Sequence, residues 1–205
     1  MEINKELDKL LKQVEKPARY IGGEIHSAVK NPDQVRLRFG FAFPDTYEIG
    51  MSYMGLQLLY SILNQDEDIY CERVFAPAMD MEAYMRKAGM DLFTLETKTP
   101  VKELDFLGFT LQYELSFTNV VNMLDLGKIP ILAVERKEED PLIIAGGPCA
   151  YNPEPLADIV DVFLIGDGEE LLPQVVKTRR VGQSKEEYLK EICSLPGVYI
   201  PRFYQ

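Results

Sequence analysis

The stretch VRLRFGFAFPDTYEIGMSYMGLQLLYSILN, residues 35–64, decides the fold. Its first part alternates polar and apolar residues and then becomes uniformly apolar, as expected of a strand that enters a buried sheet. A turn-forming segment with Gly50 and Gly55 follows. After it, LQLLYSILN places leucine and isoleucine at helical spacing. The stretch therefore predicts a strand, a loop and a helix in that order.

The same alternation continues through the rest of the chain. The further predicted strands are CERVFA (71–76), DLFTLE (91–96), DFLGFTL (105–111), PLIIAGG (141–147) and VDVFLIG (160–166), and the predicted helices are MDMEAYMRKAG (79–89), FTNVVNMLDLG (117–127) and DGEELLPQVVKTR (167–179). Short apolar strands separated by helices imply right-handed crossovers and a mostly parallel sheet covered on both faces. The sequence predicts an α/β fold, a flavodoxin-like (Rossmann-like) doubly wound sheet of about six strands with flanking helices.

The chain divides into one core domain and two appendages. We expect the α/β domain at residues 31–182, after an N-terminal helical appendage at residues 1–30 in which residues 4–15 carry leucines at helical spacing. Residues 183–205 are expected to form a short helix and an extended tail with exposed aromatic residues, directed toward a further domain that this sequence does not contain.

Composition restricts the class of partner and the kind of site. With 22 basic and 33 acidic residues the net charge is −11, which argues against nucleic acid as a partner. No apolar run approaches the roughly 20 residues needed to span a bilayer, and the charged start is unlike a signal peptide, so we expect no membrane contact and a cytoplasmic protein. Three scattered cysteines and one histidine indicate no metal site, and we assign no catalytic residue.

Four loops are candidates for a ligand site, because open parallel sheets bind ligands beyond the carboxyl ends of their strands. None contains a phosphate-binding GxxxxGK[ST] or a GxGxxG motif. The candidate cofactor-binding residues are Pro44, Asp45, Tyr47, Glu48 and Gly50 in the first loop, Gln112, Tyr113, Glu114 and Ser116 in the second, Gly146, Gly147 and Pro148 in the third, and Gly166, Gly168 and Glu169 in the fourth.

Each loop also has a structural interpretation. The first is equally consistent with a tight turn in which Ser52 caps a helix, and capping by Ser116 or Thr118 explains the hydroxyls of the second. In the fourth, Asp167 and Glu170 have the spacing of a capping box. The third has the structural interpretation of a strained turn stiffened by Pro148, Pro153 and Pro155. It gives the strongest ligand signal, because two successive glycines after a strand let a flat ring or a sugar approach the backbone.

Several sequence segments together resemble the amino-terminal region of a family of radical S-adenosylmethionine proteins with a cobalamin-binding domain. They extend from about Val14 to Leu172 and are VEKPARYIGGE (14–24), FAFPDTYEIGMSYMGLQLLY (41–60), ERVFAPAMDMEA (72–83), LQYELSFTNVVNMLDL (111–126), IAGGPCAYNPEPLADIVD (144–161) and IGDGEE (165–170). The resemblance implies a cobalamin-binding-like domain that precedes a radical barrel with a CxxxCxxC-bound 4Fe-4S cluster and S-adenosylmethionine.

That resemblance sets the functional expectation. This sequence has no CxxxCxxC, so the cluster and S-adenosylmethionine belong to a radical SAM domain in cis or in trans. The implied ligand is a corrinoid such as cobalamin, with the double glycine and the GDGE stretch at 166–169 shaping a pocket for its nucleotide tail. The loop PDTYEIG lacks the histidine of DxHxxG loops, so cobalt would receive no histidine from it. The alternative is a ligand-free scaffold or interaction domain of the same fold.

Overall fold

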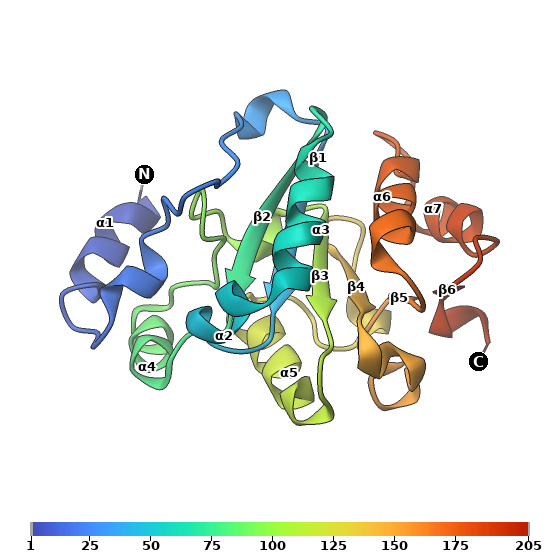
Figure 1. The fold of residues 1–205 in the computed structure, drawn as a ribbon. Helices are drawn as coiled ribbons and strands as arrows, with labels where there is room; N and C mark the ends of the chain where they lie inside the picture. Colours follow the sequence, from blue (N-terminus) through green and yellow to red (C-terminus); the bar gives the residue numbers. More distant parts are fainter. Residues whose placement is uncertain (1, 205) are drawn as a thin grey trace.

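The computed structural model describes residues 2–204, and the side chains of residues 5–204. In this part of the chain six strands form one sheet in the order β2-β1-β3-β4-β5-β6 (Figure 1). The first five run parallel, and β6 is antiparallel to β5. The strands are β1 (Leu37–Phe43), β2 (Ile69–Phe75), β3 (Phe106–Thr110), β4 (Leu142–Gly146), β5 (Val162–Leu164) and β6 (Val198–Tyr199). This order confirms the flavodoxin-like prediction, with the change of direction between β1 and β3.

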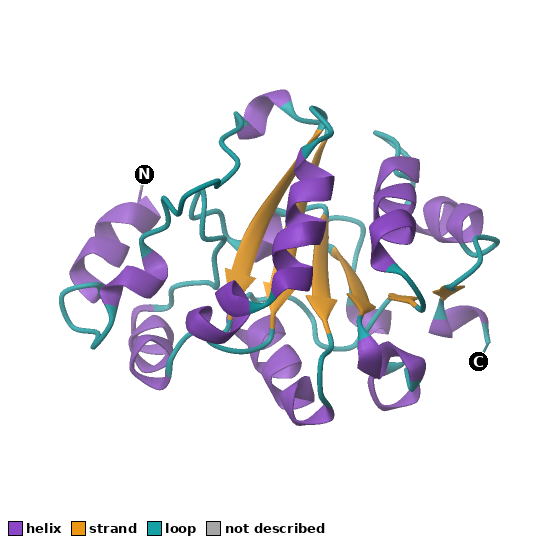
Figure 2. Cartoon of the chain, viewed as in Figure 1, coloured by secondary structure: helices purple, strands orange, loops and turns teal. Residues whose placement is uncertain are grey.

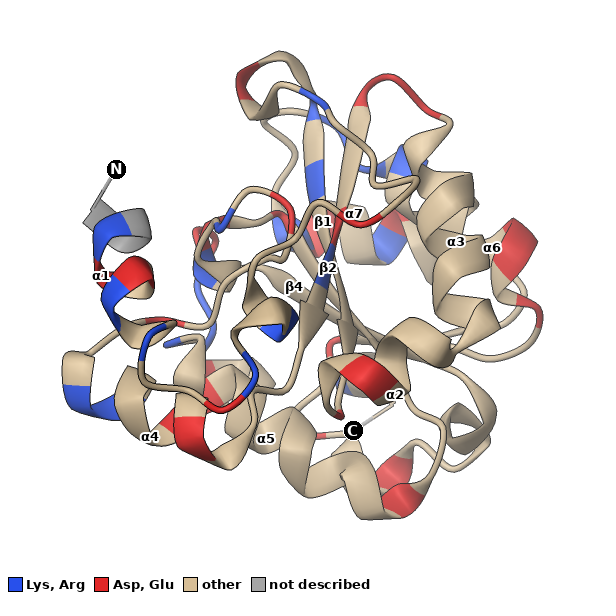
Figure 3. Ribbon diagram, turned by 60° about the vertical axis from the view of Figure 1, so that its left-hand side comes forward, with Lys and Arg blue, Asp and Glu red and all other residues tan. Residues whose placement is uncertain are grey.

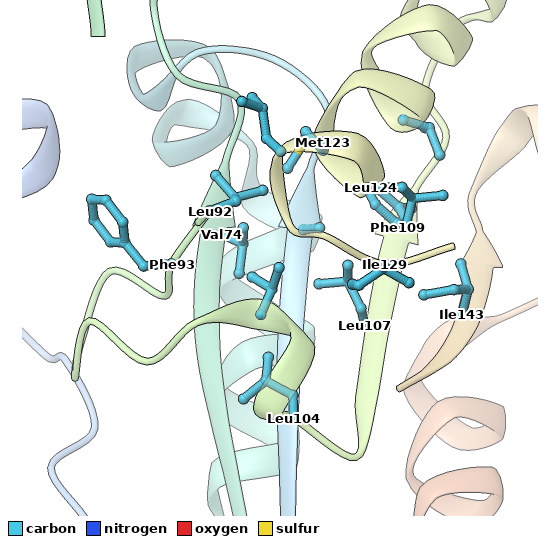
Figure 4. Close-up of a cluster of buried hydrophobic side chains, with 14 of the residues drawn as sticks. Val74, Leu92, Phe93, Leu104, Leu107, Phe109, Met123, Leu124, Ile129 and Ile143 are labelled. Carbon is cyan, nitrogen blue, oxygen red and sulfur yellow. The ribbon is translucent and has the colours of Figure 1, made fainter. Parts of the chain in front are cut away.

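Helices cover both faces of the sheet (Figure 2). Their bounds are α1 (Glu2–Leu10), α2 (Tyr47–Ser52), α3 (Met54–Asn64), α4 (Met79–Ala88), α5 (Phe117–Leu126), α6 (Gly168–Thr178) and α7 (Lys185–Ile192). Buried residues of α3, α6 and α7 pack together on one face, and those of α1, α4 and α5 pack on the other. Figure 4 shows part of the second cluster, in which Leu107 and Phe109 of β3 meet Met123 of α5. None of the described helices is long and apolar enough to cross a bilayer.

One predicted strand is wrong and another replaces it. Residues 91–96 form no regular strand, and Phe93 makes only an isolated bridge to Pro100. Their apolar side chains are instead buried from a loop whose backbone bonds to several neighbours, such as Leu92 N to Leu126 O at 3.0 Å. The sixth strand is β6, in the tail that was predicted only as extended. Periodicity alone does not separate a short buried strand from a buried loop.

The helix caps predicted at Ser52 and Asp167 do not form. Ser52 is the last residue of α2, and its hydroxyl donates to the carbonyl of Ile49. Asp167 stands at the N-cap of α6 without a side-chain capping bond. A reciprocal capping box occurs at α7 instead, between Ser184 and Glu187.

A buried arginine fastens the N-terminal segment over the edge strand β2. Arg73 is 2% exposed, and its Nε lies 2.8 Å from Glu96 Oε1. Its Nη2 lies 3.2 Å from Glu24 Oε2 and donates to Ser27 Oγ at 2.7 Å, and its guanidinium lies over the Tyr60 ring. The backbone of the same residue is bonded at the strand edge by the loop around residues 95–96, with Leu95 N donating to Arg73 O at 2.7 Å and Arg73 N donating to Glu96 Oε2 at 2.7 Å, so this edge is not open to pairing with another chain.

Arg73→Ala should destabilise the protein by about 3–5 kcal/mol, because Glu96 would remain as a buried charge without its partner. Urea unfolding followed by circular dichroism measures this loss. Arg180→Ala is the matched control, since Arg180 pairs with Glu191 on the surface and its removal should change stability little. Equal losses for the two variants would contradict the anchoring role of Arg73.

Candidate functional site

A cavity of about 170 Å³ lies at the carboxyl ends of β1, β3, β4 and β5, on the face that α3 and α6 cover. The strands supply most of its apolar wall, and one leucine from each helix closes the sides. The apolar lining comprises Phe39, Phe41, Phe109, Ile144, Leu164, Leu59 of α3 and Leu172 of α6, with Tyr53 just before α3. A cavity with this lining takes up apolar ligands more readily than it takes up water.

Glycines create this space. A Cβ at Gly146 would meet only Leu164, at an ordinary 3.6 Å, so the missing side chain leaves room beside the cavity. A Cβ on Gly168 would lie 3.3 Å from Leu59, which shows that the start of α6 is close to α3. In the middle of β3, Gly108 makes room for the Phe39 ring, 2.3 Å from where its Cβ would stand. The sheet wall is therefore shaped by residues that lack side chains.

The rim of the cavity carries few polar groups. Gln112 Nε2 donates to Thr110 Oγ1 at 2.5 Å, and both residues line the cavity. The first turn of α6 lies there too, with Gly168 and an exposed Glu169. An apolar floor with a few polar groups at the rim suits a flat ring whose edge can form hydrogen bonds.

Six of the fifteen predicted site residues line this cavity: Gln112, Gly146, Gly147, Gly166, Gly168 and Glu169. They come from three of the four predicted loops. The cavity thus brings together the loops after β3, β4 and β5, and the loop after β1 contributes none of its predicted residues.

The two glycines of the third loop have different roles. Gly147 has φ +98°, and a Cβ there would lie 2.8 Å from the carbonyl oxygen of Leu111. The same carbonyl accepts a hydrogen bond from the N–H of Cys149 at 3.1 Å, so the turn is fixed at this point. Pro148 begins the short turn that follows and is exposed. Gly147 is required by the backbone, whereas Gly146 leaves space for a ligand.

The loops after β1 and β3 are tied together beside the cavity. Tyr113 donates its hydroxyl hydrogen bond to Asp45, and this bond raises the pKa of Tyr113. Asn119 Nδ2 donates to the carbonyl of Pro44 at 2.8 Å. Ser116 is buried and its hydroxyl donates to the carbonyl of Tyr113, so it does not cap α5. These residues brace the point where the strand order changes direction and do not line the cavity.

Glu114 is exposed at the start of the same turn. It lies close to Cys149, and burial first, then the charge of Glu114, raises the pKa of that thiol. A raised pKa keeps the thiol protonated, which disfavours Cys149 as a nucleophile.

Tyr47 and Glu48 face the N-terminal segment and not the cavity. The Tyr47 hydroxyl donates to Glu24 at 3.2 Å, and Arg19 lies 2.8 Å from Glu48. The hydrogen bond from Arg19 holds the pKa of Glu48 below its usual value. Gly50 accommodates a neighbouring ring, since its Cβ would lie 2.3 Å from a ring atom of Phe75.

Sequence reasoning missed the apolar wall. Phe39, Phe41 and Leu59 appear in the sequence as ordinary core residues, and nothing marks them as cavity-lining. A signal was available in Gly108, a glycine inside the strand FLGFT, because such a glycine often marks close approach of a neighbouring group. Among the described residues, no group of three or more His, Cys, Asp or Glu side chains could hold a metal ion.

Comparison with known proteins places the chain among its relatives. A family model for the N-terminal region of radical SAM proteins matches residues 55–201. The uncharacterized protein MJ0966 of Methanocaldococcus jannaschii is 23% identical over 137 residues, which are 65% of this chain and 25% of that protein. The chain thus spans about a quarter of the length of the curated relative it matches. No solved structure matches the chain.

The cavity should bind a small apolar probe such as benzene or xenon, which occupy a buried apolar cavity of roughly 150 Å³. NMR shifts of the Leu59 and Leu164 methyl groups would report binding. Gly146→Leu fills the space without backbone strain, because Gly146 has no positive φ, and should abolish these shifts. Ser61→Leu, on the exposed side of α3, adds the same side chain elsewhere and should leave them unchanged. Undiminished shifts in Gly146→Leu would place the probe outside the cavity.

Proposed function

This chain belongs to the N-terminal domain family of radical SAM proteins, and from that premise we propose that it is an accessory domain that holds a corrinoid for a neighbouring radical domain. The sequence contains no CxxxCxxC, so the 4Fe-4S cluster and S-adenosylmethionine are assigned to that radical domain. The corrinoid, cobalamin or a close relative, is the ligand assigned to this chain.

One observation carries the proposal: the apolar cavity at the carboxyl ends of the strands. Roughly 150 Å³ is enough for benzene, so a cavity of about 170 Å³ admits a flat aromatic group and is far too small for a corrin ring. The proposal therefore buries the base of the nucleotide tail between α3 and α6 and leaves the corrin outside, at the ends of the strands. Burial of a flat apolar group in such a site contributes roughly 25 cal/mol per Å² of apolar area.

The residues at the rim fit this kind of ligand. Thr110 and Gln112 offer a hydroxyl and an amide to the polar edge of a buried base. The loop after β1 offers no histidine, and Asp45 already accepts the Tyr113 hydroxyl. The chain would therefore hold the ligand through the tail pocket and not through cobalt. A bound corrinoid would supply a redox-active cobalt to the neighbouring domain.

The second candidate is a scaffold of the same fold that binds no ligand. The bond between Tyr113 and Asp45 favours it, because this bond joins the loops after β1 and β3 across the point where flavodoxin-like proteins bind their ligands. A scaffold would contact the radical domain and leave the cavity empty.

Anaerobic titration with hydroxocobalamin and methylcobalamin, followed by absorbance and calorimetry, tests the corrinoid proposal. We expect saturable micromolar binding, weakened at least roughly tenfold by Gly146→Leu, because that side chain fills the tail pocket. Ser61→Leu should bind as the unchanged protein does. Gly147→Leu is a poorer test, because its φ and its contact with the Leu111 carbonyl would disturb the turn itself.

Two further results complete this test. The free base of the nucleotide tail should compete for the pocket, since the pocket is proposed to recognise that part of the ligand. If neither cobalamin binds to protein that circular dichroism shows to be folded, the corrinoid proposal fails for this chain and the scaffold remains.

A further inference from the structure

Five segments meet at the carboxyl ends of the strands, and together they form what we call the strand-end face. In Figure 1 the arrowheads of the long strands point toward this face, where α2 lies. The segments are residues 44–54, 76–82, 111–119, 146–158 and 165–172. They contain ten acidic residues and no lysine or arginine: Asp45, Glu48, Asp80, Glu82, Glu114, Glu154, Asp158, Asp167, Glu169 and Glu170.

Several of these carboxylates lack a cationic partner. Glu48 is paired with Arg19 of the N-terminal segment, and Glu82 with Arg86 one turn further along α4. By contrast, Glu114, Asp167 and Glu169 have no basic side chain within ion-pair distance among residues 5–204. The acidic residues of the chain are red in Figure 3. The carboxylates of Glu114, Asp167 and Glu169, which make no ion pair within residues 5–204, therefore give this face a negative potential.

Large apolar side chains stand exposed on the same face. Met54, Leu115 and Tyr151 are 82%, 85% and 72% exposed, and they come from the segments after β1, β3 and β4. Exposed apolar residues surrounded by polar ones mark interaction surfaces in soluble proteins. Because the three residues come from loops at the same edge of the sheet, they favour one shared contact surface over three unrelated exposed side chains.

Hydrogen bonds join four of the five segments to one another, so that part of the face is preformed. Ala76 N donates to Asp45 O at 3.0 Å, which joins the segments after β2 and β1. The bond from Asn119 to Pro44 joins the segments after β1 and β3. Cys149 N donates to Leu111 O at 3.1 Å and joins those after β3 and β4. A surface held in one shape loses little entropy on docking.

We propose that the strand-end face is the docking surface for the radical domain, and that this domain presents lysine and arginine around an apolar centre. The inference rests on the proposed function only in taking the chain as an accessory domain of a radical SAM protein, and it requires no corrinoid. Charge complementarity favours the radical domain as the partner. Nucleic acid would be repelled, and a second copy of this chain would bring carboxylates against carboxylates.

The position of the C-terminal tail supports the radical domain as the partner at this face. The Tyr199 hydroxyl donates to Glu154 of the strand-end face at 3.0 Å, and the Tyr204 ring lies 5.1 Å from that of Tyr199. Any chain that continues from Tyr204 therefore starts next to this face. The curated relative is about four times as long as the part matched here, which leaves length for a further domain.

Photo-cross-linking in the protein as the cell makes it, with the radical domain in the same polypeptide or in a separate one, tests the inference. A photoreactive amino acid at Leu115 or Tyr151 should yield links to the radical domain, at peptides that contain Lys or Arg. The control position is Val181, which is 82% exposed and lies after α6, away from the strand-end face. Mass spectrometry identifies the linked peptides.

Charge reversal supplies the second readout. With the photoreactive group at Tyr151, Asp167→Lys should lower the yield of links roughly tenfold, because like charges then face each other. Glu67→Lys, an exposed residue before β2, should leave the yield unchanged. Raising the salt concentration should lower the yield in the unchanged protein, since exposed charges are screened within about 10 Å at 0.1 M.

Every other outcome overturns the docking surface. Four results would each do so. The first is links from Val181 as abundant as those from Leu115, and the second is links between two copies of this chain. The others are a lack of links to the radical domain, and equal yields for Asp167→Lys and Glu67→Lys. The experiment is run without corrinoid. Cobalamin binding without cross-links would refute only the docking surface, and cross-links without cobalamin binding would refute only the corrinoid proposal.

Discussion

The parallel pairing of β1 with β3 is the constraint on which the rest of the structure depends. Phe39 and Phe41 of β1 stand beside Phe106 and Gly108 of β3, although about seventy residues separate the two strands in the sequence. The chain leaves β1 toward β2 on one side and continues from β3 toward β4 on the other. The loops after β1 and β3 therefore diverge, and the ends of the strands are left open to a ligand or a partner.

The loops around that opening have different roles. The loop after β1 faces the N-terminal segment, through Tyr47 and Glu48, and contributes to the stability of the edge. The loops after β3, β4 and β5 face the cavity. The bond between Tyr113 and Asp45 holds the two groups of loops together. A substitution at Tyr47 or Glu48 should therefore act through stability, whereas one in the other three loops can act on binding directly.

The sequence predicted the order of the elements well because strand and helix periods are local properties. It failed for residues 91–96, where an apolar run is buried as a loop, and for β6, whose two residues are too few to show a period. In the candidate site, glycines after strands were visible, but their roles depend on neighbours far along the chain. Gly146 and Gly147 look alike in the sequence, yet one faces Leu164 and the other the Leu111 carbonyl.

The electrostatics of the strand ends bear on the kind of ligand that fits. The N-terminus of α6 lies at the cavity, and free N–H groups there would favour a phosphate. Asp167, Glu169 and Glu170 in that same turn oppose it, and no lysine or arginine of the strand-end segments supports it. A nucleotide with several phosphates would thus bring negative charge to a negative surface. A ligand anchored by a flat apolar group meets less of that repulsion, even where its tail carries a single phosphodiester as that of cobalamin does, because its binding energy comes from contact with Phe41, Leu59 and Leu164 inside the cavity.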